Sequence, residues 1–206
     1  MERSKRILRF WRWFERDAMS LLRRPSLDII EDFDERLQEI DVEISSEVSS
    51  RLADEDRELI ITSHGMQSKF ELIDEMVKLA PVIDGWSVQS LKPPRGFGFR
   101  VDGVDDIDLG KWKYVPLKKT MEYIEYCLRI EMPEQDRLRV DDIALFNIME
   151  GGLGEVLFSL CSHVEYETSK TPGARPLDSL VVSVFSWAVC RGPASIKRFL
   201  PDVDLG

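Results

Sequence analysis

Apolar side chains recur every three or four positions over residues 5–23, and this spacing predicts an amphipathic helix. A similar stripe follows Pro25 and predicts a second helix that ends near residue 39. Apolar and polar residues then alternate over residues 42–48, which predicts a strand. We therefore expect residues 1–40 to form a helical pair that packs on the main body of the protein.

Two β-runs with a helical segment between them occupy residues 58–91. The runs are "ELIITS" (58–63) and "WSVQSL" (86–91), and "HGMQSKFELIDEMVKLAP" between them has one apolar helical face. A right-handed crossover between parallel strands and a split arrangement both fit this order.

The second half of the chain alternates between short β-runs and helical patterns. Strands are expected in "FGFRV" (97–101), "KWKYVPL", "MEYIEYCLRIEM" and "EVLFSLCSHVEYE", and helices in "DRLRVDDIALFNIMEG" and "LDSLVVSVFSWAVC". The "GGLG" at 151–154 predicts a turn. The predicted fold class is α+β, with a mostly antiparallel sheet of about six or seven strands and packed helices. Residues 41–206 are expected to form one α+β domain.

Several motifs resemble those of a family of bacterial conserved hypothetical proteins that begin with an FWxWF helix. The matching stretches are "FWRWFER", "ELIITSHG", "KFELIDEMVKLAPVIDGWSVQSLKPPRG" and "GGLGE", so the likeness extends to about residue 166. The resemblance implies a soluble bacterial α+β protein. It implies no activity and no site residues, because the family has no established function.

Charge is distributed unevenly along the chain. The net charge is −10, yet residues 1–24 hold eight basic and three acidic residues, a local charge of +5. The remainder carries −15, which disfavours nucleic acid as a partner. The sequence has neither a secretory pattern nor an apolar run long enough for a membrane span. Its three cysteines, Cys127, Cys161 and Cys190, lack CxxC spacing, so we expect free thiols and a cytoplasmic location.

The segment "RFWRWFER" (9–16) combines four aromatic residues with three arginines. The helix that contains it has four interpretations: packing within the protein or against a twin subunit, binding a partner, lying on a membrane surface, or binding nucleic acid. Packing is favoured, because the aromatic side chains follow the apolar stripe. This interpretation predicts that Trp11 and Phe14 are buried. Trp11 and Trp13 are also candidate residues for binding a partner.

Candidate chemistry is sparse. The turn Ser63, His64 and Gly65 lies between a strand and a helix and is a candidate anion-binding site, although a plain connecting turn is favoured. The acidic loop at 102–108 contains Asp102, Asp105, Asp106 and Asp108, but it lacks the spacing of a calcium loop and predicts a metal-free turn. Cys161 and His163 are interpreted as ordinary strand residues, and we expect no cofactor.

These patterns favour a non-catalytic protein-binding or interaction module. Its ligand would be a protein partner or a second copy of the chain, without nucleic acid or stable membrane association. Neutralising a toxin is one version of this function. The alternative is a small hydrolase-like enzyme that uses carboxylates near the 63–65 turn or the 102–108 loop.

Overall fold

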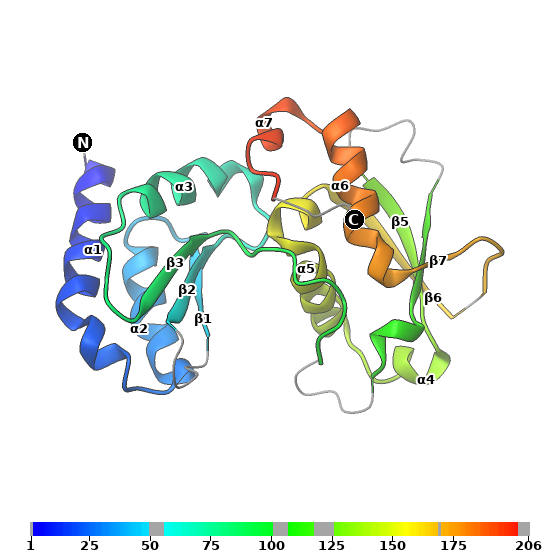
Figure 1. Ribbon diagram of the computed structural model, residues 1–206, viewed down its shortest axis with the longest axis horizontal. Helices are drawn as coiled ribbons and strands as arrows, with labels where there is room; N and C mark the ends of the chain where they lie inside the picture. The colour runs from blue at the N-terminus through cyan, green and yellow to red at the C-terminus, as the bar shows by residue number, and fades with distance from the viewer. Residues whose placement is uncertain (1, 50–55, 101–106, 118–125, 169, 202–206) are drawn as a thin grey trace. The chain divides into compact units, whose positions relative to one another are not determined.

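Two helices followed by a small mixed sheet begin the protein in the computed structural model (Figure 1). The structure describes residues 2–49, 56–100, 107–117, 126–168 and 170–201. The chain divides into two compact units, Met1–Lys92 and Pro93–Gly206. The predicted helical pair therefore shares a unit with the first sheet.

The first unit confirms the two helices and the strand–helix–strand order. Helix α1 spans Glu2–Leu21 and α2 spans Ser26–Gln38. Strands β1 (Ser45–Val48), β2 (Arg57–Thr62) and β3 (Trp86–Ser90) form a sheet in the order β1-β2-β3. β1 is antiparallel to β2, whereas β2 and β3 are parallel. A short 3₁₀ turn (Gln67–Lys69) and helix α3 (Phe70–Lys78) connect the parallel pair and pack on it.

Aromatic rings form the centre of this unit. The ring of Phe14 meets those of Phe33 on α2 and Trp86 on β3, with centroids 5.2 and 5.0 Å away in edge-to-face geometry. Trp11 and Phe14 are buried, as the helical stripe predicts. Such pairs stabilise a core beyond the area that they bury.

The second unit contains a four-stranded sheet with helices. Strands β4 (Lys113–Pro116), β5 (Tyr126–Glu131), β6 (Cys161–Glu167) and β7 (Arg175–Pro176) are ordered β6-β5-β4-β7. Helices α4 (Glu134–Arg137) and α5 (Asp142–Phe158) lie between the parallel strands β5 and β6 in the chain. Helix α6 (Leu180–Arg191) packs on α5, and α7 spans Ala194–Lys197.

The α+β class and seven strands among the described residues confirm the predicted fold class, but the strands form two sheets rather than one. Each sheet is mixed, with one parallel pair. Strand patterns along a sequence identify strands but not their partners, so they did not separate the two sheets.

Three element predictions in the second unit were wrong. The "GGLG" at 151–154 lies inside α5, which continues to Phe158, so the predicted strand begins only at Cys161. The described residues 97–100 of "FGFRV" form no strand.

The three glycines of "GGLG" have different roles in α5. Gly154 interrupts α5 with a φ of 72°, which a glycine adopts readily. The other two glycines admit aromatic rings instead, since Phe97 and Phe99 pack where side chains of residues 152 and 151 would point.

A matched pair of glycine variants tests this packing. An alanine Cβ at Gly152 would lie 2.2 Å from a ring carbon of buried Phe97, whereas at Gly151 the nearest atom would be 3.5 Å away. We expect Gly152→Ala to lower the free energy of unfolding by about 1–3 kcal/mol through overpacking. Gly151→Ala should be neutral or stabilise α5 by up to about 1 kcal/mol. Urea denaturation measures both, and equal stability of the two variants would show that Phe97 does not constrain residue 152.

Candidate functional site

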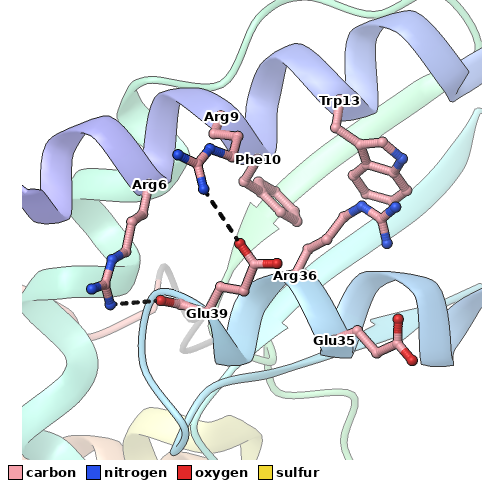
Figure 2. A pocket seen from close by; sticks show the side chains of 7 residues that line it. All are labelled: Arg6, Arg9, Phe10, Trp13, Glu35, Arg36 and Glu39. Carbon is pink, nitrogen blue, oxygen red and sulfur yellow. Dashed lines mark hydrogen bonds and ion pairs between the residues drawn. The ribbon is translucent and has the colours of Figure 1, made fainter.

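A groove of about 260 Å³ lies between α1 and α2 (Figure 2). Four of its residues come from α1 and three from α2 or the position that follows it. They are Arg6, Arg9, Phe10, Trp13, Glu35, Arg36 and Glu39. Residues spaced by three or four positions share a helix face, so each helix presents one flank to the groove.

Phe10 and Trp13 provide the aromatic side of the groove (Figure 2). Both are buried, and Trp13 is 8% exposed. The guanidinium carbon of Arg36 lies 4.0 Å from the centroid of the Trp13 ring, a cation–π contact between the two helices. Arg36 also donates from Nη1 to the Asp32 carbonyl at 3.0 Å. These contacts hold the Arg36 side chain along the groove.

Arg6 and Arg9 approach the other end of the groove, where Glu39 follows α2 (Figure 2). Arg6 Nη1 donates to the Glu39 carbonyl oxygen at 2.9 Å. A cation at the C-terminal end of a helix is favoured, because the last carbonyl groups of the helix carry partial negative charge. Arg9 Nη1 lies 3.9 Å from Glu39 Oε2, and the Arg9 side chain is 73% exposed. This second contact is therefore a loose ion pair at the surface.

Further cations cover the solvent-facing side of α1. Lys5, Arg12 and Arg16 are exposed there. Arg16 donates from Nε to Asp17 Oδ1 at 2.9 Å, and this hydrogen bond lowers the pKa of the Asp17 carboxyl below its ordinary value. The exposed side of α1 is thus predominantly basic, whereas its apolar side is buried in the unit.

The two candidate tryptophans have different surroundings. Trp11 is 3% exposed and donates from Nε1 to the Met76 carbonyl at 2.9 Å, so it belongs to the core between α1 and α3. Trp13 lies at the groove beneath Arg36. A ligand in the groove could contact the small part of the Trp13 ring that stays exposed, whereas Trp11 does not line the groove.

The predicted 63–65 turn follows β2 directly, and it contains polar side chains and residues with positive φ angles. His64 and Leu91 have positive φ angles of 52° and 61°, which non-glycine residues adopt rarely. Ser63 is buried and donates from Oγ to the Met66 carbonyl at 3.2 Å. Gly65 has a φ of 87° and completes the turn. Each of these conformations lies close to the end of β2 or β3.

The ring of His64 bridges β1 and Lys92, the second residue after β3. Its Nε2 is 2.9 Å from Ser45 Oγ, and its Nδ1 is 3.3 Å from Lys92 Nζ. Lys92 is buried and pairs with Glu47 at 2.6 Å. The His64 ring thereby connects the hydroxyl of Ser45 with the ammonium group of Lys92. Glu47, which pairs with Lys92, is thus a carboxylate that the structure places beside the 63–65 turn.

Other sequence candidates are separated or lie outside the described residues. Cys161 donates to the Leu157 carbonyl at 3.6 Å, and burial raises the pKa of its thiol, which disfavours a nucleophilic thiolate. His163 instead contacts Glu165 at 3.1 Å. Asp102, Asp105 and Asp106 of the acidic loop lie outside the described residues. Asp108 is exposed, accepts from the Gly110 amide and pairs with Lys111 at 3.3 Å.

Sequence reasoning found α1 but missed Glu35, Arg36 and Glu39 as groove residues. Their three- and four-residue spacing was a usable signal, because two helices joined by a short turn pack side by side.

Within the described residues, no group of three His, Cys, Asp or Glu side chains is placed to hold a metal ion. Every helix in the described part of the chain is too short or too polar to span a lipid bilayer.

Comparison of the chain with family models, curated proteins and solved structures finds no match. Any role of the groove has to be inferred from its own residues.

Proposed function

We propose that the unit Met1–Lys92 is a non-catalytic binding module that recognises an acidic segment of a partner protein through the groove between α1 and α2. The observation that carries this proposal is the combination of exposed guanidinium groups with a buried aromatic wall in that groove. Arginine and aromatic residues are enriched at the energetic centres of protein–protein interfaces.

The size of the groove fits an anchor side chain rather than a whole ligand. Its 260 Å³ is below the range of about 300–1,000 Å³ that is typical of small-molecule sites. A stable protein interface buries about 1,200–2,000 Å² in total, so the partner would also contact the basic side of α1. The cations Lys5 and Arg12 on that side are suited to steer an acidic surface toward the groove.

Mixed charge in the groove favours a protein over a nucleic acid. Glu35 and Glu39 line it together with the three arginines, and a phosphate backbone would meet their carboxylates. A membrane surface is disfavoured for a different reason. Surface-bound helices insert an apolar face, whereas the apolar face of α1 is already buried within the unit.

The partner chemistry also bears on toxin neutralisation. A neutralising role stays within this proposal if the toxin presents an acidic segment to the groove. A second copy of the chain is the competing occupant, since its net charge of −10 supplies acidic segments as well.

A charge-reversal pair tests the proposed function. Arg9→Glu places an acid at the groove, while Arg23→Glu makes the same change at an exposed position just after α1. In affinity capture from the native cell, we expect wild type and Arg23→Glu to retain one discrete partner and Arg9→Glu to lose it. The purified partner should then bind wild type directly, more weakly as salt rises.

Three outcomes contradict the proposal. Equal capture by all three proteins would place the binding surface elsewhere. Concentration-dependent self-association that Arg9→Glu abolishes would make a second copy the occupant. Binding to anionic vesicles or to nucleic acid, with loss in Arg9→Glu, would assign the basic side to that ligand instead.

A further inference from the structure

We infer that the groove contains a carboxylate subsite at Arg6 and Arg9, in which Glu39 of the same chain is the resident competitor. An aspartate or glutamate side chain of the partner would bind these arginines by displacing the Glu39 carboxylate. This inference rests on the proposed function and specifies the chemistry that its groove recognises.

The contact between Arg9 and Glu39 leaves most of the guanidinium unused. Hydrogen bonds between arginine and carboxylate are about 2.7–2.9 Å long and often come in parallel pairs. The distance here is 3.9 Å, and Arg9 and Glu39 are 73% and 59% exposed. The donors of Arg9 therefore stay accessible to a second carboxylate. An exposed ion pair of this length is weak, so displacing Glu39 costs little.

Arg6 prepares the same position from the preceding turn of α1. Its Nη1 is held by the Glu39 carbonyl oxygen at 2.9 Å, an interaction with the backbone that survives movement of the Glu39 side chain. Figure 2 shows Arg6 and Arg9 both directed from α1 toward Glu39. An incoming carboxylate at this end would meet the guanidinium of Arg6, which the backbone holds in place, and the exposed guanidinium of Arg9 beside it.

The aromatic wall sets the direction from which the ligand enters. Arg36 is stacked on Trp13 and bonded to the Asp32 carbonyl, so it is fixed at the other end of the groove. The acidic side chain therefore belongs at the Arg6 and Arg9 end, with the remaining part of the ligand passing over Phe10. A helical segment with glutamates four residues apart suits two arginines that are three residues apart.

The probe for this subsite is a fluorescein-labelled helical peptide with glutamates at positions i and i+4, compared with its glutamine twin. Glu39→Gln removes the competing carboxylate and keeps the backbone carbonyl that holds Arg6. We expect this variant to bind the peptide about two- to fivefold more tightly than wild type, as measured by fluorescence anisotropy. Arg9→Gln should weaken binding about tenfold.

Glu31→Gln is the matched control, because Glu31 is exposed on α2 but does not line the groove. It should change the affinity less than twofold, and the glutamine twin should bind none of the proteins measurably. If Glu39→Gln binds as wild type does, or more weakly, Glu39 is not a competitor and the inference is wrong. If neither protein binds the peptide at millimolar concentration, there is no carboxylate subsite. The affinity capture with Arg9→Glu tests the proposed function independently, because it does not depend on the peptide or on Glu39.

Discussion

Replacing Trp11 with alanine should lower the free energy of unfolding by about 3–5 kcal/mol, because a large buried aromatic side chain leaves a cavity when it is truncated. Trp11 is 3% exposed, and its indole meets the Phe10 ring in edge-to-face geometry with a centroid distance of 4.7 Å. The variant also leaves the buried Met76 carbonyl without its indole donor. Urea denaturation followed by circular dichroism measures the loss.

Arg12→Ala is the control for this prediction. Arg12 follows Trp11 directly but is exposed on the other side of α1, so its removal should change stability by less than about 0.5 kcal/mol. Trp11→Ala with the stability of wild type would mean that α1 does not pack on α3 through this side chain. Loss of vesicle binding in both variants would then favour a membrane-surface helix.

Replacing Arg57 with methionine should also destabilise the protein by about 3–5 kcal/mol, because several buried carbonyl groups lose the guanidinium that donates to them. Arg57 begins β2 and is 1% exposed. Its guanidinium donates to the carbonyls of Leu21 and Arg24 at 3.0 and 2.7 Å, where α1 ends. It also donates to Ser26 Oγ at 2.7 Å and to the Ser49 carbonyl at 3.1 Å.

The hydrogen bonds to Leu21, Arg24 and Ser26 tie the turn between α1 and α2 to the sheet, and the fourth reaches the residue after β1. Arg57→Lys keeps the charge but not the planar fork of donors, so it should recover part of the lost stability and not all of it. Arg23→Met, at an exposed position, serves as the control and should lie close to wild type. If Arg57→Met were as stable as that control, water would have to satisfy the carbonyls that Arg57 bonds.

The burial of Trp11 and Phe14 was predictable, because their spacing with Ile7 and Ala18 matches one helix face. The role of Arg57 was not, since its partners lie 8 to 36 residues away in the chain and no local pattern connects them. The glycines of "GGLG" led to a wrong turn prediction because the side chains that pack against them are also distant in the sequence. A glycine inside a helix is disfavoured locally, and only the rings packed against Gly151 and Gly152 explain it.

The groove was partly predictable. The alternation of arginine with aromatic residues in "RFWRWFER" indicated a basic side of α1 opposite a buried one. The four-residue spacing of Glu35 and Glu39 places both on one face of α2, but whether that face meets the arginines of α1 depends on how the two helices pack. The contact between His64 and Lys92 depends likewise on the pairing of β2 with β3.

Site-specific photo-crosslinking in the native cell tests the binding role of the groove most directly. A photoreactive amino acid replaces Glu35 at the groove in one protein and exposed Leu27, at the opposite end of α2, in the other. Both proteins keep Arg6 and Arg9. We expect position 35 to give one discrete adduct with a different protein, and the partner peptide identified by mass spectrometry should be rich in Asp and Glu. Position 27 should not give that adduct. The same adduct from both positions, or none from position 35, would contradict a binding role for the groove.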